Sequence, residues 1–182
     1  MIADGRVTRR AWVGLALALA IVWPAVVSPG DAFRVLDLLR LPSPKPAAEF
    51  TVPGLLNRPI ASRDFRGKVL FLNFWATWCP PCKEEMPSME RLYRRYKDRG
   101  FAMLAISIDA GDKAGVAAFV KKYGLTFTIG LDASLEVANR YTVRALPSSF
   151  LIDRSGHIVA VALGPRDWDG TAAHGVIEGL LK

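Results

Sequence analysis

Cysteine and histidine are scarce in this 182-residue chain, which contains two of each. A small fold stapled by disulfides needs several cysteine pairs, so that class of protein is excluded. A structural zinc site needs four ligands, and His157 and His174 lie far along the sequence from both cysteines. The 15 glycines and 12 prolines follow no repeating period, which excludes collagen-like and low-complexity chains.

Acidic residues are in deficit as well, because 17 Asp and Glu face 24 Lys and Arg and leave a net charge of +7. The densest basic run spans residues 91–99, with a spacing typical of the solvent face of a helix. A nucleic-acid groove would interleave such charges with stacking aromatic rings, so we expect no nucleic-acid partner. With 51% hydrophobic residues, the chain can build one globular domain of about 150 residues plus an appendage.

The appendage is N-terminal. Residues 11–30 contain no charged side chain, and Arg6, Arg9 and Arg10 precede them. A basic flank before about 20 apolar residues predicts a membrane anchor at 11–29, with residues 1–10 in the cytoplasm and the rest of the chain outside it. A cleaved signal peptide is the alternative. Its best site, after Ala18-Leu19-Ala20, would leave an apolar segment at the new N-terminus, so we favour the anchor.

Residues 30–48 are expected to form a spacer between the anchor and the folded domain. They contain a short amphipathic segment and then Pro42, Pro44 and Pro46, whose spacing favours a stiff, extended chain. The folded domain is therefore expected to span 49–182.

Within that domain, short apolar runs predict strands, and apolar residues three and four apart predict helices. Strands are expected at 69–74, 102–108, 127–129, 149–153 and 157–163. Helices are expected at 80–99, 113–123, 135–141 and from Thr171 onward, with a kink at Pro87. The turn at residues 153–156 favours a hairpin between the last two strands. This order predicts an α/β fold with a mixed central sheet and helices on both faces.

Both cysteines lie where the first buried strand ends and the first long helix begins. Unpaired N–H groups and the dipole at a helix N-terminus favour an anion, so we expect Cys79 to have a lowered thiol pKa and to attack disulfides. Cys82, one turn later, is placed to resolve the mixed disulfide. The spacing also permits a Cys79–Cys82 disulfide. In an exported α/β domain, this position makes the pair a strong indication of redox chemistry.

Other uses of the two cysteines are a peroxidase centre or a metal site. The specialised anion-stabilising loop of a peroxidase is not evident in the sequence. Copper binding through Cys79, Cys82 and a distant histidine stays open as an alternative, because a thiol pair accepts soft Cu(I).

Two segments, FLNFWATWCPPCKEEMP (71–87) and ALPSSFLIDRSGHIV (145–159), strongly resemble the TlpA/ResA-like branch of the thioredoxin superfamily. The resemblance extends over about residues 50–168. It implies a thioredoxin-like fold and thiol–disulfide exchange on other proteins, with no cofactor. Similar members have one anchor and one domain outside the bacterial inner membrane, and commonly serve cytochrome c maturation or copper-site assembly of cytochrome oxidase.

The resemblance also assigns roles to single residues. Cys79 matches the attacking cysteine and Cys82 the resolving one. Pro147 matches the cis-proline that faces the disulfide, with Leu146 before it, and Trp78 matches an aromatic lid, so these three residues are expected to contact substrate. Glu85 matches a glutamate that tunes the cysteines in reductases of this branch, although a solvated carboxylate on the first helical turns is an equally consistent interpretation. Glu84 is a weaker candidate for the glutamate that tunes the cysteines.

Two departures from the wider thioredoxin pattern bear on the chemistry of the cysteines. Asn73 replaces a buried Asp that accepts the proton of the resolving thiol, so Glu85 or water must take that proton. Pro80 and Pro81 remove two backbone donors from the start of the helix, which leaves the Cys79 thiolate less stabilised and favours a reductant.

Taken with the resemblance, these features predict a periplasm-facing thiol:disulfide oxidoreductase of the bacterial inner membrane that mainly reduces exported proteins. The expected partners are exported cysteine-containing proteins, such as apocytochrome c or copper-assembly proteins, and a membrane thiol electron donor. A copper- or haem-delivery protein that uses the cysteine pair as a metal site is the alternative.

Overall fold

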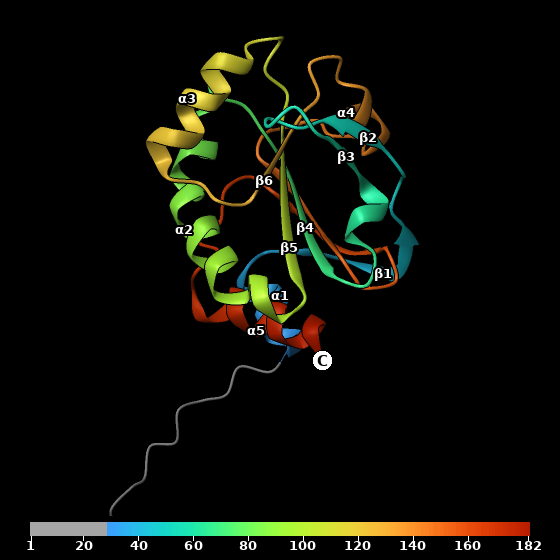
Figure 1. The fold of residues 1–182 in the computed structure, drawn as a ribbon. Coiled ribbons are helices and arrows are strands. Elements are labelled where there is room, and N and C mark those ends of the chain that lie inside the picture. Colours follow the sequence, from blue (N-terminus) through green and yellow to red (C-terminus); the bar gives the residue numbers. More distant parts are fainter. Residues whose placement is uncertain (1–28) are drawn as a thin grey trace, which may run out of the picture.

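A six-stranded mixed sheet forms the centre of residues 29–182, the part of the chain that the computed structural model describes (Figure 1). Its strands lie in the order β1-β8-β7-β4-β5-β6. β4, β5 and β6 are parallel, and β7, β8 and β1 are antiparallel to their neighbours. The six strands are β1 Leu39–Pro46, β4 Val69–Trp75, β5 Phe101–Ser107, β6 Thr128–Leu131, β7 Ser148–Ile152 and β8 His157–Leu163.

Helices cover both faces of the sheet, as the sequence predicts, and Figure 1 shows α2 and α3 on one side with α4 on the other. A small hairpin of β2 (Thr51–Pro53) and β3 (Pro59–Ala61) lies on the α4 side. The helices are α1 Pro29–Val35, α2 Pro80–Tyr96, α3 Lys113–Tyr123, α4 Glu136–Arg140 and α5 Thr171–Leu181, with short 3-10 turns at η1 Ser62–Phe65 and η2 Lys97–Arg99. The helices α2 to α5 and the strands β4 to β8 lie within a few residues of the expected positions.

The side chains of β4 explain why this strand is central. All seven are buried, and the six apolar ones are divided between two clusters on opposite faces of the sheet. Phe71 and Trp75 pack with α2, α3 and α5, whereas Leu72 and Phe74 pack with α4 and the small hairpin. A strand buried on both faces is a continuous apolar run, which is the pattern that predicted it.

The sheet is extended by a strand that the sequence did not predict. Residues 39–46, expected to be part of a free spacer, form β1 and pair with β8 at the edge of the sheet. Upstream of it, α1 packs against α5 through Ala32, which is fully buried. The folded domain therefore begins before the expected boundary at Glu49, and this corrects the spacer prediction. Prolines two residues apart remove donors from one side of a strand only, which an edge strand tolerates.

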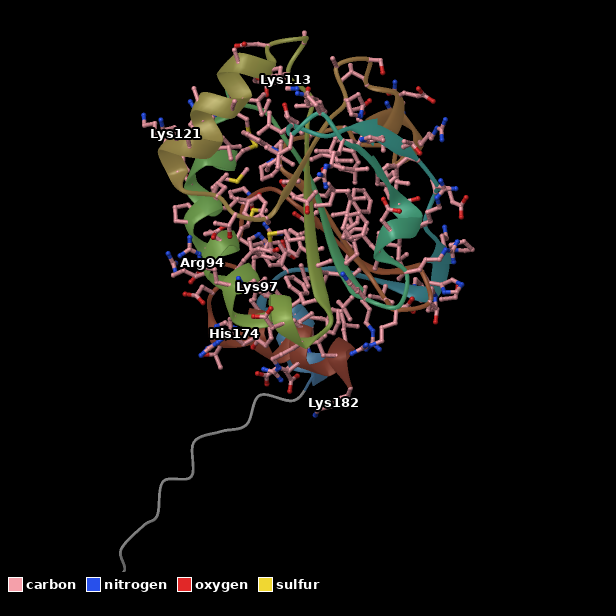
Figure 2. All side chains as sticks on the ribbon, viewed as in Figure 1. Arg94, Lys97, Lys113, Lys121, His174 and Lys182 are labelled. Carbon is pink, nitrogen blue, oxygen red and sulfur yellow. A yellow bond between two sulfur atoms is a disulfide. The ribbon has the colours of Figure 1, made fainter. Side chains whose placement is uncertain are left out.

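The basic run at 91–99 lies on the outside of α2 and η2, as expected for a solvated helix face, with Arg94 and Lys97 at its outer surface (Figure 2). The expected anchor at 11–29 and the cytoplasmic flank at 1–10 lie almost wholly outside the described residues. Among residues 29–182, no helix has the length and apolar character needed to cross a membrane.

Candidate active site

Cys79 and Cys82 form a disulfide at the junction between β4 and α2, with an S–S distance of 2.09 Å. Cys79 is the N-cap residue of α2 and keeps an extended backbone, so the chain turns from strand to helix at this side chain. Cys79 is 4% exposed and Cys82 is fully buried. Cys79 is thus slightly the more exposed residue of the pair, and its role as the attacking cysteine stays a prediction.

The two prolines that follow Cys79 limit the donors that its sulfur can receive. Pro80 and Pro81 are the first residues of α2 and carry no N–H. The backbone N–H of Cys82 is the first that the helix offers, and it points to the Cys79 Sγ at 3.3 Å. The helix start therefore supplies one main-chain donor where a helix without prolines offers more.

An apolar groove of about 420 Å³ opens beside Cys79. Trp78, which is 63% exposed, lies next to Cys79 on its wall, and Leu146 contributes to the lining from the segment before β7. Arg144 is the charged residue among those that line the groove. The structure thus brings two of the three predicted substrate-contacting residues to the cysteine, in a groove suited to an apolar segment of another protein.

The third, Pro147, is buried and is not among the residues that line the groove. The Leu146–Pro147 peptide bond is cis, as the resemblance implies. The Pro147 carbonyl accepts a hydrogen bond from the Gly164 N–H at 2.9 Å. Its part in substrate binding stays a prediction.

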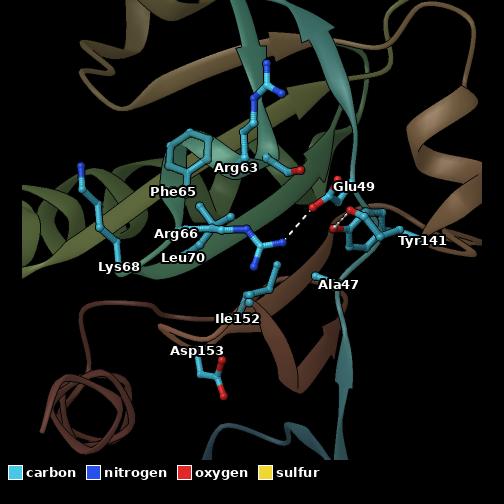
Figure 3. A pocket seen from close by; sticks show the side chains of 13 residues that line it. Ala47, Glu49, Arg63, Phe65, Arg66, Lys68, Leu70, Tyr141, Ile152 and Asp153 are labelled. Carbon is cyan, nitrogen blue, oxygen red and sulfur yellow. Dashed lines mark hydrogen bonds and ion pairs between the residues drawn. The ribbon is translucent and has the colours of Figure 1, made fainter.

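A second cavity, at the other end of the domain, is much smaller. Its volume is about 40 Å³, which suits water rather than a peptide. Figure 3 shows it lined by Arg66, whose guanidinium pairs with Glu49 at 2.8 Å, and by Tyr141.

Glu85 lies in the interior, on α2 one turn beyond Cys82, and is 2% exposed. Its Oε1 accepts a hydrogen bond from Asn73 Nδ2 at 3.0 Å, and its Oε2 accepts one from Trp168 Nε1 at 3.0 Å and a longer one from the Arg166 N–H at 3.3 Å. Burial raises the pKa of Glu85 from 4.5 to about 7, although these hydrogen bonds and the Arg166 charge oppose the rise. Glu85 is therefore no solvated helix residue, whereas Glu84 is exposed.

Asn73, in the place of the usual buried acid, is fully buried on β4 and bridges Glu85 to Ser149 Oγ, which its Nδ2 reaches at 3.0 Å. The Asn73 Oδ1 has no hydrogen-bond partner among the described residues. Asn73 therefore orients Glu85 and leaves that carboxyl as the titratable group between α2 and β4.

Sequence reasoning missed the residues that fix the surroundings of the cysteines. Asp109, after β5, is buried and accepts hydrogen bonds from the Thr77 hydroxyl and from Ser107 Oγ, both at 2.6 Å, and from the Thr77 N–H. These bonds hold the loop that carries Trp78 and Cys79. No motif marks Asp109, because its partner is 32 residues away.

Trp168 and Arg166 were also missed. They lie in the irregular segment between β8 and α5, where no periodicity predicts which side chain is buried. Trp168 is 1% exposed and packs edge-on against Phe71, with ring centroids 4.5 Å apart. The tryptophan itself was a weak signal, because Trp78 is exposed whereas Trp168 is buried through its packing against Phe71 of β4.

No group of three or more His, Cys, Asp or Glu side chains in residues 29–182 is arranged to hold a metal ion. His174 lies beside the end of α2 (Figure 2), where it contacts Tyr96 at 3.1 Å and Asp169 at 3.2 Å. His157 lies at the start of β8, with Asp153 at 3.7 Å. Neither histidine is therefore a third ligand for the cysteine pair in this structure.

The strand-to-helix disulfide, the cis-proline and the mixed sheet define a thiol:disulfide oxidoreductase with the thioredoxin fold, and comparisons with known proteins agree. The AhpC/TSA family model matches residues 44–161. The thiol-disulfide oxidoreductase ResA of Bacillus thuringiensis is 43% identical over 138 residues, which are 76% of each chain.

Solved structures show the same likeness. A Chlorobium tepidum protein assigned as thiol:disulfide interchange protein DsbE superposes with a TM-score of 0.72 at 32% identity, covering 78% of this chain and 99% of that one. A thiol:disulfide interchange protein of the thioredoxin family from the same organism gives 0.66 at 29% identity, covering 77% and 98%. The chain belongs to the AhpC/TSA family and to its ResA-like thiol-disulfide oxidoreductases. Its substrates are accordingly cysteine-containing proteins.

Proposed function

We propose that this oxidoreductase works mainly as a reductant of disulfides in exported proteins, on the periplasmic side of the bacterial inner membrane. The first residues of α2 support this direction of electron transfer, from the cysteine pair to the substrate. Because Pro80 and Pro81 supply no N–H, Cys79 Sγ receives one main-chain donor from the helix, that of Cys82. A thiolate with fewer donors is less stable, which disfavours the reduced pair and makes it a stronger reductant.

The reaction begins with the Cys79 thiolate, which attacks one sulfur of a substrate disulfide held in the groove. The attacked sulfur becomes bonded to Cys79 in a mixed disulfide, and the other substrate sulfur leaves as a thiolate. Cys82 then loses its proton and attacks Cys79 Sγ, which releases the second substrate thiolate. Two electrons pass to the substrate, and the Cys79–Cys82 pair is oxidised to the disulfide seen here.

Glu85 is the proposed acceptor of the Cys82 proton. It is three residues beyond Cys82 on α2, so both side chains lie on one face of the helix. A carboxyl with a pKa of about 7 exists in both protonation states at neutral pH, which suits a group that takes up and releases a proton in each cycle. Asn73, its neighbour on β4, cannot perform this step because an amide does not accept a proton at this pH.

The location and the partners belong to the same proposal. The arginine flank and the apolar stretch at 11–29 support an anchor in the membrane. Such a protein would draw electrons from a membrane thiol donor and pass them to apocytochrome c or to copper-assembly proteins. The apolar groove beside Cys79 supports a protein substrate, because it can bind an extended segment around the target cysteine.

The decisive measurement is the equilibrium potential of the Cys79–Cys82 pair in glutathione buffers. We expect a value more negative than about −200 mV, in or below the range of glutaredoxins. A potential near −120 mV, that of the strong oxidant DsbA, would overturn the reductant proposal and leave an oxidase.

Titration of Cu(I) against the parent and against the Cys79→Ser/Cys82→Ser double variant distinguishes metal delivery from disulfide exchange. We expect weak binding that leaves disulfide exchange as the activity. Tight binding by the parent, lost in the double variant, would favour copper delivery instead.

Topology is tested by fractionation and N-terminal sequencing. We expect a membrane-bound chain with an intact N-terminus and its C-terminus outside the cytoplasm. A mature soluble form that begins near Ile21 or Asp31 would contradict the anchor.

A further inference from the structure

Arg166 joins the redox site to the N-terminal segment of the domain. Its backbone N–H points to Glu85 Oε2 at 3.3 Å, and two residues later Trp168 Nε1 donates to the same oxygen at 3.0 Å. The segment between β8 and α5 therefore supplies both donors to one oxygen of the buried carboxyl. Its position determines whether those donors reach Glu85.

The Arg166 side chain extends from this segment in the other direction. Its Nε donates to the Leu36 carbonyl at 2.6 Å, and its Nη2 donates to the Asp37 carbonyl at 3.1 Å and to Asp37 Oδ2 at 2.9 Å. The guanidinium is 17% exposed, although the Asp37 carboxylate is 88% exposed. Three bonds in a fixed planar geometry fasten the segment to residues 36–37, which connect α1 to β1.

We propose that Arg166 is a positioning residue for Glu85, which clamps the segment carrying the Glu85 donors onto residues 36–37 and supplies a positive charge that acts on the carboxyl from a distance. The proposal rests on the proposed role of Glu85 as proton acceptor. It also gives residues 36–37, which lie within the spacer that the sequence predicts at 30–48, a part in the redox site.

The groups that face Glu85 make Arg166 the source of positive charge at this site. Asn73 from β4 and Trp168 from the segment before α5 are neutral, and Ser88 Oγ donates to the Glu85 carbonyl at 2.8 Å. Cys82 is the other titratable group on the same face of α2, and it is tied up in the disulfide here. The Asp37 carboxylate pairs with the Arg166 guanidinium on the side away from Glu85 and partly neutralises its charge. The Arg166 charge lowers the pKa of Glu85 against the effect of burial.

The test compares the full-length parent with Arg166→Gln, which removes the charge, and Arg166→Lys, which keeps the charge but loses the planar set of donors. Arg91→Gln is the matched control. Arg91 pairs with Asp169 at 2.6 Å, so this control breaks an arginine–aspartate pair of the same C-terminal segment without touching Glu85. Carbon-13 NMR of the Glu85 carboxyl in the oxidised protein follows its titration directly, independent of activity.

We expect Arg166→Gln to raise the apparent pKa of Glu85 by up to about one unit, because it removes the positive charge and the clamp together. From a starting pKa of about 7, a shift of a full unit leaves about fivefold less ionised carboxylate at pH 7. Release of substrate from the mixed disulfide should slow by the same factor at pH 7 and recover at higher pH. Arg91→Gln should change neither quantity.

Arg166→Lys separates the charge from the clamp. It should raise the Glu85 pKa less than Arg166→Gln does, because it keeps the charge and weakens only the clamp that positions the Glu85 donors. Amide exchange at residues 36–38 should become faster, as it does in Arg166→Gln. A Glu85 titration that is the same in Arg166→Gln and the parent would overturn the proposal. If Glu85→Gln instead exchanges disulfides as fast as the parent, the proton-acceptor role fails, and the effect of Arg166 on the Glu85 titration is judged on its own.

Discussion

The two halves of α2 differ although each buries a glutamate. In the first half, residues 80–86, Glu85 receives its side-chain hydrogen bonds from the neutral groups of Asn73 and Trp168. In the second half, residues 88–96, Glu90 is 7% exposed and bonds to Arg94 Nε at 2.5 Å. The helix thus carries one carboxyl without a direct cationic partner and one that has such a partner.

The other contacts of Glu90 show what its carboxylate does. It accepts the Thr126 N–H at 2.8 Å and the Thr126 hydroxyl at 2.6 Å, which ties α2 to the segment before β6. Donors that favour the ionised form make a buried carboxylate a fixed structural element. Glu85, with weaker support for its charge, can change protonation. Both glutamates are buried, so it is the difference in their partners that supports a structural role for Glu90 beside the proposed reactive role of Glu85.

The largest effect is expected at the cysteines of the first half. Cys82→Ser should trap covalent mixed disulfides through Cys79, and Cys79→Ser should trap none, because Cys79 is the helix-capping and more accessible sulfur. Non-reducing gels of substrate mixtures measure this directly. The chain has no third cysteine to confuse the result, and equal trapping by both variants would reverse the assigned order.

The next effect is the pH dependence of stability that Glu85 introduces. Its folded-state pKa of about 7 exceeds the unfolded value of 4.5, so the folded protein binds the extra proton between those values. This contribution is fully present below pH 4.5 and is lost as the pH rises through 7, by about 3 kcal/mol in all. Urea unfolding of the oxidised parent and Glu85→Gln from pH 4 to 8 measures it.

We expect the stability difference between these two proteins to change with pH in favour of Glu85→Gln at pH 8. A difference that is constant across the range would mean that Glu85 titrates alike in the folded and unfolded states. Such a result would remove the contrast between the two halves of the helix.

Glu90→Gln is the matched variant in the second half. Gln keeps the shape but removes the charge that receives the Thr126 and Arg94 donors, so we expect a loss of about 2 kcal/mol in unfolding free energy at pH 7. The potential of the cysteine pair should not change. A shifted potential in Glu90→Gln would show that the two halves are coupled.

Glu85→Gln should in turn alter the cysteines. Removing a negative charge on the same helix face should lower the Cys79 pKa by up to about one unit, or about 1.4 kcal/mol, and make the potential more oxidising. Reduction of substrate should become slower. The pH dependence of the Cys79 alkylation rate measures this change in pKa. Superimposable curves for the variant and the parent would restrict Glu85 to a packing role.

Sequence patterns predicted the parts of this molecule that are regular. The apolar run of β4 and the position of Cys79 placed the disulfide at the correct junction, because both signals are local. The burial of Glu85 was left open, since periodicity puts it on the inner face of α2 while its charge favours solvent. The hydrogen-bond partners of Glu85 allow it to be buried, and local patterns do not predict them because Trp168 lies 83 residues away.

The N-terminal segment was harder to predict for a related reason. Pro42, Pro44 and Pro46 are depleted in strands generally, and they are tolerated in β1 because it lies at the edge of the sheet. The position of β1 at the edge depends on the arrangement of the whole sheet, and no local sequence pattern predicts that arrangement. The same holds for Arg166, whose partners at residues 36–37 are 129 and 130 residues away.

The smallest effect is expected at the C-terminal end of α2. Tyr96 is fully buried, and its hydroxyl donates to Glu178 at 2.9 Å and lies 3.1 Å from His174 Nδ1, both on α5. Tyr96→Phe keeps the packing and removes these bonds. Because the exposed Glu178 can bind water instead, the cost should be about 1 kcal/mol in unfolding free energy. The potential and the Cys79 alkylation profile should match those of the parent, because Tyr96 lies four turns of helix from the disulfide. A change in either quantity would mean that the second half of α2 also tunes the reaction, and the division drawn between the two glutamates would then fail.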